Sequence, residues 1–256
     1  MLLLFKILLV PTIIAIISIA GRIRGTAVSG LLGGLPVVAG PILVFLSIEH
    51  GEVFGSASAQ AALAGVISIG LFCFLYAAAC NRAGIVSSLI VGLLGFGTST
   101  ILFSNVHLSL ARTLILVAVF LLAILLTFPK YAALAPGYQI GTRDVLIRMF
   151  AAASVVLLIT FCSDLLGPNL SGLLAPFPIA GTILAGFTHF HSGADSARRL
   201  LHGFIKGLFG MAAFDFILSY YLTSLGISQA VILASILALI VSGSTIALTR
   251  RVGTNI

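Results

Sequence analysis

One stretch of this sequence occurs twice, and this duplication limits the folds open to the chain more than any other feature. Residues 29–51 read SGLLGGLPVVAGPILVFLSIEHG, and residues 171–193 read SGLLAPFPIAGTILAGFTHFHSG. Both begin Ser-Gly-Leu-Leu, carry a proline seven residues after the serine and end in glycine, at a constant offset of 142 residues. We call them the first and second duplicated segments. A repeat of this length indicates an internal duplication of about half the chain.

The composition predicts that this duplication lies in a membrane. Hydrophobic residues make up 60% of the chain and charged residues 7%, whereas soluble domains have about 25% charged residues. Membrane spans must satisfy their own backbone hydrogen bonds, and the apolar runs here are too long for barrel strands. We therefore expect an all-α, polytopic membrane protein with about nine transmembrane helices.

The expected spans form two related halves. They cover about 2–20, 27–48, 58–80, 85–103, 113–128, 146–163, 170–190, 200–222 and 227–248. The 142-residue offset pairs the first four spans with the last four and leaves the fifth alone. The predicted organisation is a first repeat (1–104), a linking span with a cytoplasmic linker (105–142) and a second repeat (143–256).

An odd number of spans separates the duplicates, so the second half should enter the membrane from the opposite side. The charges agree with such an inverted repeat. On one side are eleven basic residues: Arg22, Arg24, Arg82, Lys130, Arg143, Arg148, Arg198, Arg199, Lys206, Arg250 and Arg251. On the other are Lys6 and Arg112. The positive-inside rule then predicts an N-terminus outside and a cytoplasmic C-terminus.

Glycine and proline interrupt the duplicated segments in spans 2 and 7, because proline lacks a backbone donor and glycine weakens a helix. Interrupted spans at matching positions of inverted halves point to a transporter binding site; the alternative is a bent helix that only packs. The candidate pathway residues are Ser29, Gly33, Gly34, Pro36, Gly40, Pro41, Ser171, Pro176, Pro178, Gly181 and Thr182.

Asp215 lies near the middle of span 8, in the run LFGMAAFDFILSYY. An acid at that depth is costly and should face the bundle interior. Lys206 is nine residues earlier, on the opposite face of the helix, so the two cannot pair within the span. The position suits a group that carries a proton during transport; the alternative is a structural acid bonded to a neighbour.

Polar residues cluster at the cytoplasmic ends of spans 7 and 8. His189, His191 and His202, with Asp195 between them, resemble a metal-ligand set. Polar side chains are ordinary at such a position, so we predict no metal or cofactor. The residues are either plain interface residues or a gate or lipid-headgroup contact. Glu49 is the outer counterpart of this cluster.

Other functional classes are excluded or have no support. The net charge of +7 is spread over loops, and no basic stretch is long enough to bind nucleic acid. Cys73, Cys80 and Cys162 lack the spacing of a zinc site or a disulfide framework. The apolar N-terminus lacks a small-residue cleavage site and is expected to be a retained first span. No nucleotide-binding or hydrolase motif is present in the sequence.

The paired SGLLxxxP segments, with FTHxxxG ending the second, resemble an uncharacterised family of bacterial integral membrane proteins. The resemblance implies a multi-pass protein of the bacterial inner membrane and no established activity. The general layout is also distantly similar to small inverted-repeat transporters, such as the drug/metabolite transporter group, which usually have five plus five spans.

These features lead to three hypotheses about function. The first is a small secondary transporter or flippase, not an enzyme, that works by alternating access around the paired broken helices and couples to protons through Asp215. Its partners would be the lipid bilayer and an unidentified small-molecule or lipid substrate, and a homodimer is compatible with the sequence. The alternatives are an intramembrane enzyme acting on a lipid, with the histidines as acid and base, and a non-transporting assembly or accessory protein.

Overall fold

The computed structural model describes residues 2–104, 106, 108–132, 141–174 and 178–252, and over these residues the regular structure is helical. The all-α prediction is therefore confirmed for this part of the chain. The helices are α1 (Leu2–Arg24), α2 (Thr26–Gly34), α3 (Ala39–His50), α4 (Glu52–Ala79), α5 (Ile85–Ser104), α6 (Leu110–Thr127), α7 (Thr142–Leu174), α8 (Ile179–Leu225) and α9 (Ile227–Val252).

Six helical segments of the described residues are long and apolar enough to cross a membrane. They are Thr26–His50, Glu52–Ala79, Ile85–Phe103, Leu110–Thr127, Ile179–Leu225 and Ile227–Thr245. Large apolar side chains also cover the outside of the bundle, for example Leu94 on α5, Leu126 on α6 and Leu239 on α9. This distribution is consistent with a multi-pass membrane protein in contact with lipid. The count of nine spans stays a prediction.

The first duplicated segment is interrupted where the sequence predicts it. Helix α2 ends at Gly34 and α3 begins at Ala39, so residues 35–38 are not helical. The α3 helix starts again with a hydrogen bond of 2.8 Å from Gly40 N to the Pro36 carbonyl oxygen. In the second duplicated segment α7 ends at Leu174 and α8 begins at Ile179, directly after Pro178. Residues 175–177, Pro176 among them, lie outside the described residues.

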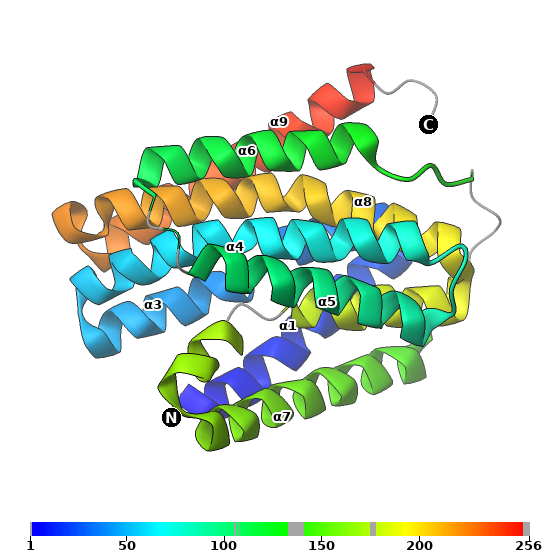
Figure 1. The fold of residues 1–256 in the computed structure, drawn as a ribbon, viewed down its shortest axis with the longest axis horizontal. Helices are drawn as coiled ribbons and strands as arrows, with labels where there is room; N and C mark the ends of the chain where they lie inside the picture. The colour runs from blue at the N-terminus through cyan, green and yellow to red at the C-terminus, as the bar shows by residue number, and fades with distance from the viewer. Residues whose placement is uncertain (1, 105, 107, 133–140, 175–177, 253–256) are drawn as a thin grey trace.

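The predicted spans 7 and 8 form one element, α8, which changes direction at Gly193 (Figure 1). Gly193 has φ 79° and ψ 176°, a conformation that costs little only for glycine. Its duplicate, Gly51, has φ 88° and ψ 164° between α3 and α4. A single glycine thus replaces each loop expected at the end of a duplicated segment, and α4 begins at Glu52 instead of near residue 58.

The longer part of α8 runs through the middle of the bundle and packs against α2, α4 and α9 (Figure 1). Its contact with α2 is a parallel, backbone-to-backbone contact made by glycine. A Cβ atom on Gly30 would collide with the Leu200 carbonyl oxygen, and one on Gly34 with the Phe204 carbonyl oxygen. In the same way, a Cβ atom on Gly203 would collide with the Ala27 carbonyl oxygen, and one on Gly207 with the Leu31 carbonyl oxygen. Small residues four apart on both helices permit this approach.

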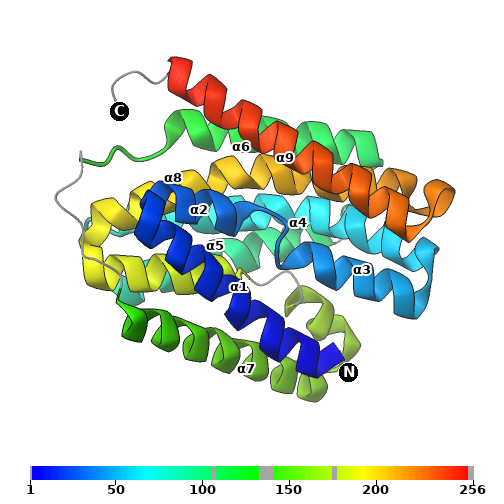
Figure 2. The same cartoon turned by 180° about the vertical axis from the view of Figure 1, so that it is seen from behind.

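Helix α4 runs antiparallel to the longer part of α8, as two hydrogen bonds show: Ser56 to the Ser219 carbonyl and Arg198 to the Ala77 carbonyl. The bundle therefore has two distinct ends. We call the end with Arg198 and the last turn of α4 the basic end, and the end with Glu49, Glu52 and the α8–α9 turn the acidic end. Helices α1 and α7 pack against each other on one flank (Figure 2).

Gly34→Ala and Gly207→Ala should each lower the free energy of unfolding by about 1–3 kcal/mol, because each methyl group meets a backbone carbonyl that cannot move aside. Unfolding in detergent micelles, followed by circular dichroism, measures this. Gly97→Ala on α5 is the matched control, because a Cβ there has no atom within 4 Å. Equal stability in all three variants would contradict the packing described here.

Candidate functional site

The two duplicated segments meet inside the bundle over the ring of Phe204, a residue of α8. A Cβ on Gly33 of the first segment would lie 2.9 Å from Phe204 Cε2 and 3.0 Å from Leu184 Cδ1 of the second segment. A Cβ on Gly181 of the second segment would lie 3.7 Å from the Cζ atom of the same ring. The two duplicated segments therefore contact each other in the interior, beside one phenylalanine, and we call this contact the crossing.

A pair of phenylalanines contacts the segments just beyond their interruptions. Phe214 Cζ lies 3.3 Å from the Cβ position of Gly40, and Phe72 Cε1 lies 3.1 Å from that of Gly181. Phe72 and Phe214 are duplicates at the 142-residue offset. Each duplicated segment thus contacts a phenylalanine that belongs to the other half of the chain.

The other candidate pathway residues lie in several environments. Gly33, Gly34 and Gly40 are buried in helix contacts, whereas Pro36 and Pro41 are half-buried. The hydroxyl groups of Ser29 and Thr182 are buried and have no hydrogen-bond partner in the part of the chain that the structure describes. Pro178 is buried and directly precedes α8. Ser171 lies in α7, but its side chain, like all of Pro176, falls outside the described residues.

Asp215 is fully buried, and neither of its carboxyl oxygens has a hydrogen-bond partner within the described residues. It follows Phe214, which contacts the start of α3 at Gly40. The register fixed by the bonds of Ser56 and Arg198 puts Gln60 of α4 at the level of Asp215. A carboxylate without a partner is very costly in such surroundings, and the proton-carrying role of Asp215 stays a prediction.

The histidines do not come together in the structure. Tyr76 Oη lies 3.1 Å from His189 Nδ1, and Tyr131 Oη lies 2.7 Å from His202 Nδ1. His191 Nε2 lies 3.5 Å from a carboxylate oxygen of Asp144. Each histidine thus has its own partner, and among the described residues no three His, Cys, Asp or Glu side chains form a group that could hold a metal ion.

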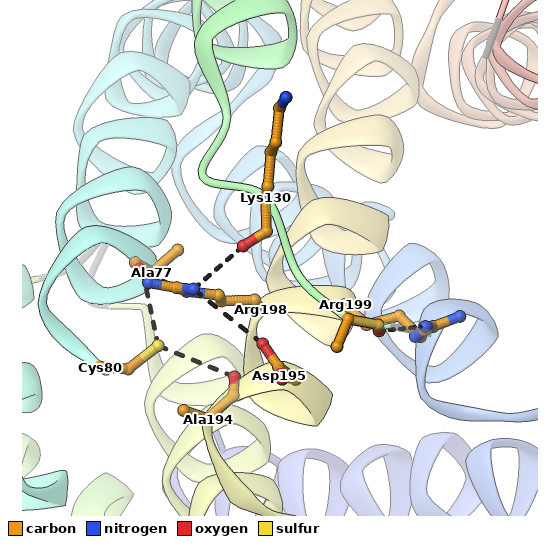
Figure 3. A network of polar contacts seen from close by, with 8 residues as sticks. Ala77, Cys80, Lys130, Ala194, Asp195, Arg198 and Arg199 are labelled. Atoms are coloured by element: carbon orange, nitrogen blue, oxygen red, sulfur yellow. Dashed lines mark hydrogen bonds and ion pairs between the residues drawn. The ribbon is translucent and has the colours of Figure 1, made fainter. Parts of the chain in front are cut away.

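Arg198 is the most connected group at the basic end (Figure 3). Its Nε donates to the Ala77 carbonyl at 2.8 Å, and its Nη1 donates to the Lys130 carbonyl at 3.0 Å and lies 4.0 Å from Asp195. A cation bound to the last turn of α4 satisfies a free carbonyl and complements the helix dipole. Beside it, burial raises the pKa of the Cys80 thiol, which therefore stays protonated at neutral pH.

Sequence reasoning missed the roles of Arg198, Tyr76 and Arg148. Arg148 is predicted to lie at a span end on the basic side, yet it is 1% exposed, and its guanidinium carbon lies 5.6 Å from the centre of the Phe187 ring. The sequence holds a signal for Arg198, because this residue is the duplicate of Ser56 and lies five residues after the end of the second duplicated segment. The predicted outer contact, Glu49, is exposed at the acidic end.

The chain matches no protein family, no curated protein and no solved structure. What the site does must therefore be argued from its own residues.

Replacing Asp215 with valine should raise the free energy of unfolding by about 1–3 kcal/mol, because it removes a buried polar group without a partner. Asp215→Asn keeps a polar group there and should change stability less. Denaturant titration of the purified variants in micelles measures the difference. A clear loss of stability in the valine variant would show that the acid is a structural group after all.

Proposed function

We propose that the chain is a small secondary carrier of the bacterial inner membrane, built as an inverted repeat, in which Asp215 couples movement of a substrate to movement of a proton. The N-terminus lies outside and the C-terminus in the cytoplasm. The substrate passes beside the crossing of the two interrupted segments, and its class is either a small molecule or a lipid.

Three observations support the inverted repeat. Gly51 and Gly193, at duplicate positions, each join two helical segments through the same backbone conformation, which Gly25 and Gly226 also adopt at helix junctions. Phe72 and Phe214, also duplicates, each contact the duplicated segment of the other half. The acidic turn at Gly51 and its basic counterpart at Gly193 carry the opposite charges that opposite sides of the membrane favour.

Asp215 carries the proposal, because it is fully buried and has no hydrogen-bond partner among the described residues. It lies on the longer part of α8, whose Phe204 contacts both duplicated segments, and it directly follows Phe214, which contacts the start of α3 at Gly40. Ionisable groups inside a membrane protein are commonly proton relays or substrate sites. A bundle built only for rigidity would gain nothing from an acid without a partner.

One observation favours a second candidate, a membrane protein that assembles with others and transports nothing. The glycines of α2 and α8 form a closed contact with no room for a side chain. The enzyme hypothesis has less support, because the histidines are separate and each has its own partner.

Transport assays with the protein reconstituted into liposomes distinguish these functions. The pH-sensitive dye pyranine inside the liposomes reports proton movement. The probes are a panel of amino acids, organic acids and cationic dyes, and, for the lipid class, a fluorescent NBD-phosphatidylglycerol whose flipping is read by dithionite quenching. We expect at least one probe to move faster in an imposed pH gradient and to carry protons with it. Asp215→Asn should reduce this gradient-driven movement to the rate in protein-free liposomes.

Cys73→Ala is the matched control, because Cys73 is the buried duplicate of Asp215 and should not affect coupling. Coupled movement that persists in Asp215→Asn would remove Asp215 from the mechanism. The absence of any protein-dependent movement across the whole panel would favour the assembly role.

A further inference from the structure

We propose that Ser56 and Arg198 control the opening of the bundle. Each holds α4 against α8 at one end of the pair by a hydrogen bond, and we call these two bonds the latches. This inference rests on the proposed function and adds the residues that control which end opens. It follows from two hydrogen bonds that occupy duplicate positions.

The latch at the acidic end is a single neutral bond. Ser56, in the second turn of α4, donates its hydroxyl to the Ser219 carbonyl of α8 at 2.6 Å. Gly55, beside it, packs against the Ser47 hydroxyl group and Leu222. This bond joins α4 to α8 at that end, and the buried apolar cluster that both helices contribute to includes Ala59 and Leu218.

The latch at the basic end is a charged one. Arg198 reaches from α8 to the Ala77 carbonyl of α4 at 2.8 Å and also holds the Lys130 carbonyl in the segment after α6 (Figure 3). Arg198 is 7% exposed. Charge-assisted bonds are about twice as strong as neutral ones, so this end is held more firmly than the other.

The two latches are equivalent positions. Residues 56 and 198 are duplicates, and so are residues 77 and 219, all at the 142-residue offset. In each case a side chain just after a duplicated segment donates to a backbone carbonyl near the end of the partner helix.

Asp215 lies between the latches along α8, and its duplicate Cys73 lies between them along α4. Both latches are closed in this structure. Release of one would free its end of α4 from α8 while the other still holds, and this is the motion that alternating access needs.

Cysteine labelling at two buried duplicate positions tests this. In a variant with Cys73, Cys80 and Cys162 replaced by alanine, the reporters are Ala59→Cys near the acidic latch and Leu201→Cys near the basic latch, each made singly. In nanodiscs, where a water-soluble maleimide reaches both ends, Ser56→Ala should raise the labelling rate at position 59 about fivefold, as expected for the loss of one neutral bond. The rate at position 201 should stay unchanged or fall.

Arg198→Ala should have the opposite effect, with a rise of about tenfold or more at position 201 and none at position 59. Arg198→Lys keeps the charge and a hydrogen-bond donor, so it should raise the labelling rate at position 201 less than Arg198→Ala does. This graded result would not be expected if the alanine variant were simply misfolded. The matched controls are Ser58→Ala on α4 and Arg199→Ala, whose guanidinium bonds the Ala132 carbonyl and not α4.

Labelling that rises at both reporters together, or at neither, would overturn the latch proposal. The reporters need no substrate, so this result is independent of the flux experiment. Opposite responses without any transport would leave the latches in place and remove the carrier function.

Discussion

The backbone-to-backbone contact between α2 and α8 is the constraint from which the rest of the arrangement follows. Four glycines, two on each helix, allow carbonyl groups of one helix to lie where a side chain of the other would stand. Association of helices in lipid depends on such close packing, because lipid tails and apolar side chains differ little as surroundings. This contact brings the first duplicated segment to the centre of the bundle, where it meets the second over Phe204.

The packing of α8 encloses one buried acid, Asp215. Asp215 lies on the helix that makes the glycine contact, and it is buried among groups that offer it no hydrogen bond in the described part of the chain. The same helix carries Arg198, and its partner α4 carries Ser56, so one antiparallel pair holds the buried acid and both closures. A change at the crossing of the segments can therefore reach the acid and both ends through rigid helices, without any long loop.

Local chemistry explains what the sequence could predict. The interruption at Pro36 was predictable because proline cannot donate a backbone hydrogen bond, whatever its surroundings. The burial of Asp215 was predictable from the apolar run around it. The conformation of Gly51 and Gly193 was not, because a glycine tolerates several backbone conformations and packing selects one. The bonds of Arg198 were not either, because they depend on where α4 ends and where the segment after α6 lies.

The central claim is that the two halves of the chain are inverted copies, and membrane-impermeant maleimide labelling in intact cells tests it most directly. Val53 and Asp195 are exposed duplicates that follow Gly51 and Gly193 by two residues. In the cysteine-free variant, Val53→Cys should be labelled in intact cells, and Asp195→Cys only after the membrane is permeabilised. Labelling of both residues from the same side would contradict the inverted repeat, and with it the interpretation of Ser56 and Arg198 as equivalent closures.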